Sequence, residues 1–581
     1  MKKRLGLATA TIAVILAAAI GVSVTVAVIG IMVYRSSQPL AVSRSADADA
    51  LIERDYKEAL SLVENDYADD IDYEKANQAA IQGMLSTLDP HSTFFTRADY
   101  DKLKQDHDSE FYGIGVTILR HRDGGYVQSP VADTPAARAG LRYGDRIVEV
   151  DGKDAREWTS DQVSKAVRGE RGESVTLKVE RAGANAPLYF TIVRDAVPLP
   201  SIRTAYMIRP GTAYIALTGG FTNTTGDELQ TSIAKLKQEG LRQLVLDLRN
   251  NPGGLLRESI NVASQFLPRG QTIVSVHGRG EYSETTSYQN TAYDPEDFPL
   301  VVLVNRNSAS ASEIVAGAIQ DYGRGYLVGE TTFGKGLVQH VFSLPYGTGL
   351  TLTTHKYLTP YGRSIQRDYS SGSFYDYYVR HDADDEPKTN AQTAPSLPAT
   401  PNVNAPVAPT PTPTPHPPTG PAVKTAAGRV FYGGGGITPD IEVKPLDVSS
   451  PVRGRIFEAA FQFTRELAAG QISGLESYRV EKPLYGHFPR PTDYVVNERV
   501  LEAFRAYVRR DPESGLTPAL VDAEADYARL RIREEITTAA YGNEAAIRTL
   551  LDSDPQLLRA LEVFPDAKRL AEMVRNGASQ S

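Results

Sequence analysis

The chain has 581 residues, a formal net charge of −9 and not a single cysteine. Its 41% hydrophobic and 23% charged residues are typical of a globular protein, which excludes disorder throughout, collagen and a polytopic membrane protein. The acidic balance argues against a nucleic-acid partner. The missing cysteines exclude disulfides, cysteine nucleophiles and cysteine-ligated zinc or iron–sulfur centres. At about 150 residues per domain, the length suggests roughly four structural units.

The N-terminus carries a short basic flank followed by a long apolar segment. Residues 2–4 read Lys-Lys-Arg, and the uncharged run over residues 5–34 ends at Arg35. A membrane-spanning helix needs about 20 apolar residues, whereas the core of a cleavable signal peptide has about 7–15. By the positive-inside rule, residues 1–4 are predicted to lie in the cytoplasm, residues 5–34 to form a transmembrane signal-anchor helix, and the rest to lie outside. A long cleavable signal is the alternative interpretation.

The remaining chain divides into five stretches by pattern. Residues 46–105 show helical periodicity, and residues 106–194 read as short strands with one or two helices. Strands and helices alternate over residues 195–381 together with 423–447, which predicts a parallel sheet with right-handed crossovers. Residues 382–422 are rich in proline and threonine and are predicted to be an extended linker, with a partner-binding motif as the alternative. Residues 448–581 are amphipathic helices whose apolar stripes indicate either core packing or a subunit interface.

One string within the second stretch is specific. Residues 140–152 read Gly-Leu-x-x-Gly-Asp-x-Ile-x-x-Val-x-Gly. With the order of strands and helices around it, this string resembles a PDZ domain of the circularly permuted type found in bacterial proteases. A generic small β domain is the alternative.

A serine stands where open α/β sheets place their sites. A buried strand over residues 301–304 leads through a polar turn into a helix of small residues, and Ser310 lies at that corner. The free N–H groups and the dipole of the helix could hold an oxyanion there. The alternative is structural, because Ser310-x-x-Glu313 also spells a capping box.

A lysine follows in a glycine-lined turn. Gly334-Lys335-Gly336 stands beside Phe333, and a desolvated lysine loses its charge more readily. A neutral amine can take a proton from a serine hydroxyl without histidine, and Gln339 could orient that amine. Residues 329–335 nearly spell a phosphate-binding loop. The serine or threonine that should ligate magnesium is Gly336, however, and a strand follows instead of a helix, so an NTPase is disfavoured.

A third string supplies backbone donors. Residues 246–254 read Leu-Asp-Leu-Arg-Asn-Asn-Pro-Gly-Gly, a strand that runs into a glycine turn and then a helix. Gly253 and Gly254 leave N–H groups exposed, as an oxyanion hole requires. A plain strand-to-helix turn is the alternative.

Together these strings resemble the carboxyl-terminal processing peptidases, also called tail-specific proteases. Lys335 follows Ser310 by 25 residues and Gln339 follows Lys335 by 4, which matches that family's Ser–Lys–Gln arrangement. The resemblance covers roughly residues 51–439 and includes Leu-Asp-Pro-His-Ser at residues 88–92. It implies an α/β (α+β multidomain) protein. Its protease core would be layered as in crotonase and Clp protease, with an inserted PDZ domain, an N-terminal transmembrane helix and a helical C-terminal extension.

The resemblance also assigns roles. Ser310 would be the nucleophile, Lys335 the general base and Gln339 its assistant, while Gly253, Gly254 and the N–H of Ala311 would form the oxyanion hole. The PDZ domain would bind a substrate C-terminus, with the carboxylate against the backbone at Tyr112, Gly113, Ile114 and Gly115 and the peptide added as a strand. Arg168 would couple the PDZ domain to the core, unless it is only part of a solvated face.

The predicted function is therefore a membrane-anchored serine endopeptidase of the bacterial inner membrane. Its catalytic part would be periplasmic, would process proteins near their C-termini through an acyl-enzyme, and would need no metal or cofactor. A homo-oligomer through the C-terminal helices and an activating adaptor are further expected partners. The alternative is a catalytically silent PDZ scaffold on a protease fold. The proline-rich interruption and the tail after residue 447 depart from the family pattern.

Overall fold

The computed structural model describes residues 46–107, 110–280, 283–369, 377, 420–426, 428–448, 450–487 and 489–578. The predicted transmembrane segment 5–34 and nearly all of the predicted linker 382–422 lie outside these residues. Within the ranges described, no helix combines the length and the apolar character that crossing a bilayer requires.

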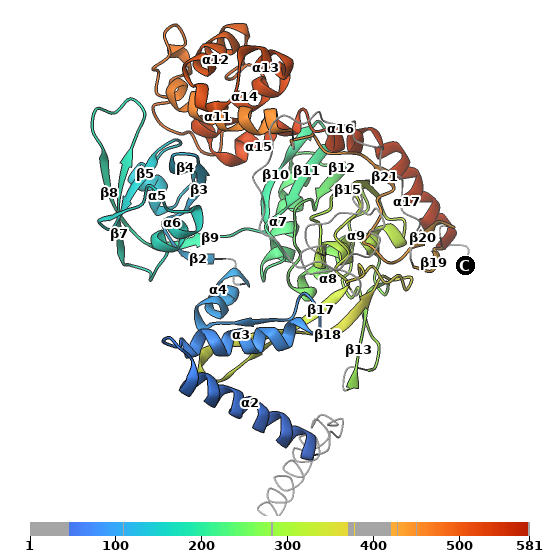
Figure 1. Ribbon diagram of the computed structural model, residues 1–581. Helices are drawn as coiled ribbons and strands as arrows, with labels where there is room; N and C mark the ends of the chain where they lie inside the picture. Colours follow the sequence, from blue (N-terminus) through green and yellow to red (C-terminus); the bar gives the residue numbers. More distant parts are fainter. Residues whose placement is uncertain are drawn as a thin grey trace, which may run out of the picture.

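A six-stranded sheet forms the core of the α/β part of the chain (Figure 1). Its strands, in spatial order, are β10 (Ile202–Arg209), β11 (Thr212–Leu217), β12 (Gln243–Asp247), β15 (Leu300–Val304), β16 (Tyr326–Gly329) and β21 (Ile441–Glu442). All neighbours from β11 onward pair in parallel, and only β10 is antiparallel to its partner. The parallel sheet predicted from the alternating pattern is therefore present.

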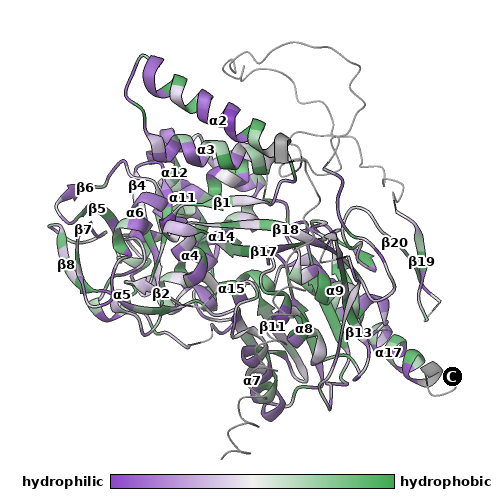
Figure 2. Ribbon diagram, turned by 90° about the horizontal axis from the view of Figure 1, so that it is seen from below, coloured by the Kyte–Doolittle hydropathy of each residue, from purple (hydrophilic) through white to green (hydrophobic). Residues whose placement is uncertain are grey.

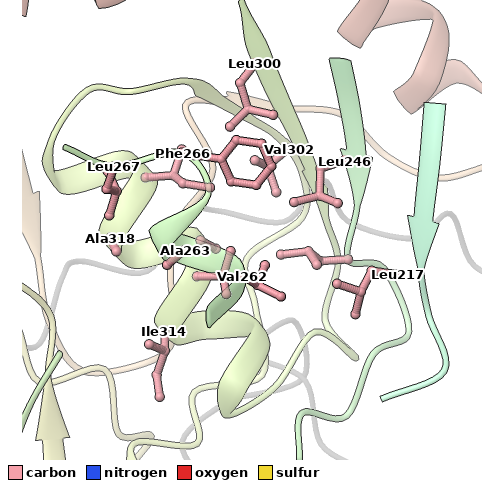
Figure 3. Packing of buried hydrophobic residues seen from close by; sticks show 14 of the residues in the cluster. Leu217, Leu246, Val262, Ala263, Phe266, Leu267, Leu300, Val302, Ile314 and Ala318 are labelled. Atoms are coloured by element: carbon pink, nitrogen blue, oxygen red, sulfur yellow. The ribbon is translucent and has the colours of Figure 1, made fainter. Parts of the chain in front are cut away.

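Helices cover both faces of this sheet. The side chains of Leu246 and Val302 point to one face, where α7 (Thr225–Gln238), α8 (Leu256–Ser264) and α9 (Ala311–Asp321) pack (Figure 3). The alternate residues of the same strands meet the C-terminal helices α16 (Pro555–Glu562) and α17 (Phe564–Ala578) on the other face. The end of the C-terminal extension is thus part of the core, because it buries the second apolar face of the sheet.

A second sheet lies beside the first. Two of its strands follow residues 334–336, here called the lysine loop, in the chain. It consists of β1 (Thr93–Phe95), β18 (Gly349–Leu358), β13 (Thr272–Gly278), β14 (Thr286–Gln289) and β17 (Leu337–Ser343). A separate hairpin is made by β19 (Ala422–Lys424) and β20 (Val430–Tyr432). The N-terminal helices are α2 (Ala46–Asp66), α3 (Tyr73–Ser86) and α4 (Arg97–His107). The apolar side chains of α2 are 40% to 56% exposed, and Figure 2 shows this helix projecting from the body.

The PDZ region is a compact β unit with two helices. Its strands are β3 (Val116–His121), β4 (Gly124–Pro130), β5 (Arg146–Val150), β6 (Lys153–Asp154), β7 (Ser174–Glu180) and β8 (Leu188–Val193), and its helices are α5 (Pro135–Ala139) and α6 (Ser160–Val167). The chain enters through β2 (Glu110–Gly113) and leaves through β9 (Asp195–Pro198), which pair antiparallel. Both ends of the unit therefore meet the rest of the protein at one point.

The first part of the C-terminal extension is a helical unit that joins the PDZ region to the core (Figure 1). It contains α11 (Pro451–Ala468), α12 (Glu498–Arg510), α13 (Pro518–Ala523), α14 (Ala525–Tyr541) and α15 (Asn543–Leu551). The apolar stripes of α11 and α12 bury one another in a single cluster. Of the two interpretations of these stripes, core packing is therefore the one observed.

One buried aromatic side chain, Phe461, lies at the centre of the contact between the helical unit and the PDZ region. Phe461 of α11 is fully buried and stacks on the ring of His121 at 3.8 Å and 11°. The edges of Tyr126 and Tyr143 close the other sides, with ring centroids 5.3 and 5.2 Å away. The hydroxyl of Tyr143 also donates to Glu535 of α14 at 2.8 Å.

Replacing Phe461 by alanine is expected to release the PDZ region from the helical unit, because removing a buried phenylalanine costs about 3–5 kcal/mol. Hydrogen exchange of β4 and of the turn at Tyr143 should accelerate. Leu558→Ala, at a side chain that is 40% exposed on α16, is the control and should change nothing at these sites. Unchanged exchange in Phe461→Ala would mean that other contacts fix the PDZ region.

Candidate active site

Ser310 occupies the corner between β15 and α9. It is the N-cap of α9 and has φ 55° and ψ −112°, a conformation that residues other than glycine rarely adopt. The preceding turn is fixed by Ser308, whose Oγ donates to the carbonyl of Leu248 at 2.9 Å and whose carbonyl accepts the N–H of Phe333 at 3.0 Å. Ser310 is thus held between two segments: residues 246–254, here called the glycine-turn strand, and the lysine loop.

Glu313 joins the serine to the lysine loop. Its side chain is fully buried, and Oε2 accepts the backbone N–H of Ser310 at 2.8 Å and that of Lys335 at 2.9 Å. Oε1 accepts the N–H of Gly334 at 2.7 Å and the hydroxyl of Thr332 at 2.5 Å. Burial raises the pKa of Glu313, and these four hydrogen bonds oppose the rise. The predicted capping contact therefore exists, but the same carboxylate also fixes the lysine.

Tyr357 makes a second connection between the same two residues. Its buried hydroxyl lies 2.7 Å from the carbonyl oxygen of Lys335 and 3.0 Å from that of Ser310, so its single proton is shared between them. Burial raises the pKa of this hydroxyl well above its usual range, which keeps it a donor. The backbones on both sides of the reacting side chains are thus fixed to each other.

The environment of Lys335 favours the neutral amine. Burial lowers its pKa, while the carboxylates of Glu313 and Asp89 act in the opposite direction. In the part of the chain that the structure describes, no hydrogen bond joins Lys335 Nζ to Ser310 Oγ. Gln339 donates its Nε2 to Thr353 Oγ1 at 3.1 Å, one strand away. Gln339 thus lies near the loop, but its amide is bonded to the neighbouring strand.

The Asp-Pro-His-Ser turn approaches the lysine from the N-terminal side. Asp89 accepts the backbone N–H groups of His91 and Ser92 at 2.8 and 2.9 Å. Burial lowers the pKa of His91 to about 4, and the charge of Lys335 adds to the fall. This imidazole is therefore neutral near pH 7, so it places no second positive charge beside Lys335.

Two of the three backbone N–H groups predicted to form the oxyanion hole have no acceptor among the described residues. In the described ranges, the N–H groups of Gly254 and Ala311 donate to no protein acceptor, whereas the N–H of Gly253 is bound by Asn251 Oδ1 at 2.9 Å. Gly253 has a different function in the packing. A Cβ there would lie 2.8 Å from Ser310 Cβ and 2.7 Å from the carbonyl of Ala309.

Gly253→Ala is expected to lower kcat by at least about 10²-fold, as loss of an oxyanion donor does, because the methyl group would displace the serine from its donors. Hydrolysis of a peptide substrate measures this. Gly240→Ala is a matched control, since Gly240 has φ +93° against +96° at Gly253 and a methyl group there would meet nothing within 4 Å. Equal kcat values for Gly253→Ala and Gly240→Ala would show that the contact of the new methyl group with Ser310 does not lower kcat.

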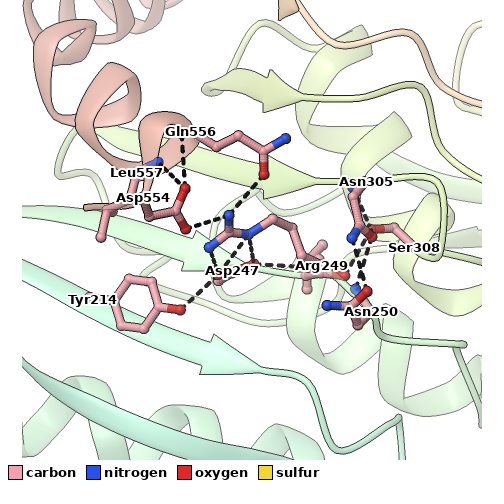
Figure 4. A network of polar contacts seen from close by, with 10 residues as sticks. Tyr214, Asp247, Arg249, Asn250, Asn305, Ser308, Asp554, Gln556 and Leu557 are labelled. Carbon is pink, nitrogen blue, oxygen red and sulfur yellow. Dashed lines mark hydrogen bonds and ion pairs between the residues drawn. The ribbon is translucent and has the colours of Figure 1, made fainter. Parts of the chain in front are cut away.

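A buried ion pair anchors the glycine-turn strand to the C-terminal extension (Figure 4). The guanidinium of Arg249 contacts Asp247 at 2.6 Å, Asp554 at 2.6 Å and Gln556 Oε1 at 2.8 Å. Tyr214 donates its hydroxyl to Asp247 at 2.7 Å. The residues that precede the candidate oxyanion donors are therefore fixed partly by the C-terminal extension.

The predicted PDZ contacts lie at the end of β2. Ile114 is buried, and in the part of the chain described the N–H groups of Ile114 and Gly115 donate to no acceptor. Gly113 pairs with Asp195 of β9. Arg168, at the end of α6, lies with its guanidinium 4.2 Å from the ring centroid of Phe111 in β2. Arg168 thus contacts the strand that links the PDZ region to the core.

The sequence interpretation missed Tyr357 and Asn251 and took Glu313 only as a cap. The contacts of Tyr357 and Glu313 with residues 334–335 span 21 or 22 residues, whereas Asn251 bonds to Gly253 two residues on. A buried carboxylate surrounded by small residues in α9 was the one available signal for Glu313. Nothing in the local pattern distinguished Tyr357 from any other strand aromatic.

Comparison with known proteins identifies two matching family models. Residues 211–376 match the model described as peptidase family S41, and residues 126–181 match a PDZ domain. The chain is 40% identical over 302 residues to the carboxy-terminal-processing protease of Bartonella bacilliformis, covering 51% of this chain and 68% of that protein. It is 34% identical over 319 residues to a probable CtpA-like serine protease of Staphylococcus saprophyticus, covering 54% of this chain and 64% of that protein.

Among solved structures, a photosystem II D1 C-terminal processing protease aligns with 31% sequence identity. The alignment covers 53% of this chain and 83% of that chain, with a TM-score of 0.32.

Proposed function

This chain belongs to the carboxy-terminal-processing proteases of peptidase family S41, and from that premise we propose that Ser310 is its nucleophile and Lys335 its general base. The chain is a serine peptidase with a PDZ domain, and the enzyme is supported over a silent scaffold. Gly254 and Ala311 are proposed as the oxyanion donors, because their N–H groups have no other acceptor among the described residues.

In the proposed reaction, the neutral amine of Lys335 takes the proton of Ser310 Oγ as this oxygen attacks the substrate carbonyl. The N–H groups of Gly254 and Ala311 stabilise the tetrahedral oxyanion. The ammonium of Lys335 then gives its proton to the leaving amine, and the C–N bond breaks to leave an acyl-enzyme. The same amine then deprotonates a water molecule, which attacks the acyl carbon, and the resulting ammonium returns the proton to Ser310 Oγ as the ester C–O bond breaks. Gln339 would assist once its amide leaves Thr353.

The observation that carries this proposal is the double connection between Ser310 and Lys335. Glu313 accepts one backbone N–H from each residue, and Tyr357 shares its proton between their two carbonyls. A structural serine cap needs neither contact with a lysine loop. Two independent contacts that fix the same pair indicate that their relative position is functional.

We propose that the PDZ domain delivers the substrate's C-terminus. The N–H groups of Ile114 and Gly115 would receive the carboxylate, and the edge strand β3 would pair with the peptide beside α6. Substrates are accordingly proteins or unfolded chains cut near their C-termini. Arg168, which covers Phe111 on β2, would transmit occupancy of the PDZ domain to the core.

The deciding experiment is cleavage of an unfolded protein with an apolar C-terminus by the full chain. Wild type should cleave and Ser310→Ala should not. Amidating the substrate's C-terminal carboxylate should slow cleavage by wild type if the PDZ domain binds that group. Equal cleavage by Ser310→Ala would remove Ser310 as the nucleophile. An unchanged rate with the amidated substrate would refute carboxylate capture.

We further propose that residues 5–34 anchor the enzyme in the bacterial inner membrane with the catalytic part in the periplasm. The support is the basic flank and the uncharged run of the sequence. Membrane association that resists carbonate and is lost on removal of residues 1–35 is expected. Full release of the intact chain by carbonate would contradict it.

A further inference from the structure

Tyr377 is buried beside the lysine loop. It lies a few residues before the predicted linker 382–422, and its side chain is 5% exposed. Its ring meets those of Phe333, His91 and Tyr369 edge to face, with centroids 5.6, 5.4 and 6.1 Å away. Three aromatic walls thus enclose one tyrosyl side chain.

The polar end of this pocket is matched to a hydroxyl group. Tyr377 Oη accepts Gln366 Nε2 at 3.3 Å and lies 2.8 Å from His91 Nε2. The direction of the hydrogen bond between Tyr377 Oη and His91 Nε2 depends on the tautomer of the imidazole. The pocket therefore offers the amide donor of Gln366 and a ring nitrogen of His91 at the position of a phenolic oxygen.

The walls of the pocket belong to the neighbourhood of the proposed general base. Phe333 precedes Lys335 by two residues, and Gln366 Oε1 accepts the N–H of Gly336, the residue after it, at 2.8 Å. The N–H of Arg367 is bound by the carbonyl of Gly334 at 2.8 Å. These hydrogen bonds tie the pocket to the loop that carries Lys335.

We propose that the pocket formed by His91, Phe333, Gln366 and Tyr369 is a substrate side-chain subsite that selects tyrosine, and that Tyr377 occupies it in the substrate-free enzyme as an intramolecular competitor. This inference rests on the proposed protease function. Tyr377 must leave before a substrate side chain can enter. The apparent affinity for substrate is then the intrinsic affinity multiplied by the fraction of molecules whose pocket is empty. Because the pocket lies next to Lys335, we expect it to select the substrate side chain near the scissile bond.

The test compares Tyr377→Ala and Tyr377→Phe with wild type in the full chain. Cleavage of a peptide with tyrosine near the scissile bond should rise about tenfold in Tyr377→Ala, the change that about 1.4 kcal/mol of released competition produces. Tyr377→Phe, which loses only the hydroxyl contacts, should fall between. Tyr432→Ala is the control. Tyr432 is a 47% exposed tyrosine of β20, and its replacement should leave the rate unchanged.

Binding is measured separately from catalysis, with N-acetyl-L-tyrosinamide as the probe. Calorimetry on Ser310→Ala/Tyr377→Ala should show the probe bound at least tenfold more tightly than on Ser310→Ala, and N-acetyl-L-phenylalaninamide should bind more weakly than the tyrosine probe. Binding here supports the subsite even if Ser310→Ala proves active and the proposed function fails. Equal binding of the probe with and without Tyr377 would overturn the inference. So would slower cleavage by both Tyr377 variants, which would make Tyr377 a packing residue.

Discussion

Lys335→Ala is expected to reduce peptide hydrolysis by about 10³-fold or more, because a positioned general base contributes about 10²–10⁴-fold and Glu313 and Tyr357 both tie the backbone of Lys335 to that of Ser310. The fold should survive the change. The hydrogen bonds that position this residue involve its backbone, with its N–H bound by Glu313 and its carbonyl by Tyr357. Steady-state kinetics together with thermal unfolding separate the two effects.

Two further variants make this test specific. Lys356→Ala removes an exposed lysine from the adjacent strand β18 and should keep full activity. Lys335→Arg keeps the positive charge but cannot supply a neutral base, so it should be as inactive as the alanine variant. Substantial hydrolysis by Lys335→Arg would show that the side chain acts only through its charge.

The pH profile of the wild type should carry the same signature. Burial lowers the pKa of Lys335, and the neutral amine exists only above that pKa. The rate should therefore rise with pH through a limb that lies below 10.5, the ordinary value for lysine, and should be lost as pH falls through it. A limb at or above the ordinary value would mean that the amine is solvated in the working enzyme.

Local patterns were sufficient to predict the parts of the site that depend on neighbours in sequence. The buried run at residues 301–304 and the small residues after Ser310 specify a strand, a turn and a helix start, and the structure has each. The glycines around Lys335 likewise specify a turn. The family motifs then placed these parts in one site, and the matches to peptidase family S41 and to the PDZ domain confirm the recognition.

What the sequence could not predict is side-chain direction within a turn and register between distant segments. The N–H of Gly253 was expected to be free, but Asn251 binds it, because a short amide two residues earlier reaches back over the turn. No prediction was made for Arg249, whose partner Asp554 is the N-cap of α16, about 300 residues later in the chain. No periodicity encodes such pairings, since they follow only once the C-terminal helices cover the sheet.

Glu313 makes both a local capping contact with Ser310 and contacts with the distant lysine loop. Glu313→Ala should therefore have the largest combined effect on stability and activity. The substitution leaves three backbone N–H groups and the hydroxyl of Thr332 buried without their acceptor, at about 1–3 kcal/mol for each group that finds no water. Activity should fall by more than about 10²-fold, because Ser310 and Lys335 lose one of their two connections. Thermal unfolding and kcat measured on the same preparation test both expectations.

The PDZ domain offers a matched control for this experiment. Helix α6 begins with a capping box of the same kind, in which Gln162 reciprocates with Thr159 on the surface. Gln162→Ala removes only a cap and should cost about 1 kcal/mol, with no effect on the rate at saturating substrate. If Glu313 were merely the cap that its spacing suggests, the two variants would behave alike. A Glu313→Ala enzyme with the stability loss of Gln162→Ala and a normal kcat would therefore show that the carboxylate does not organise the catalytic pair, and that Tyr357 alone holds Ser310 and Lys335 in register.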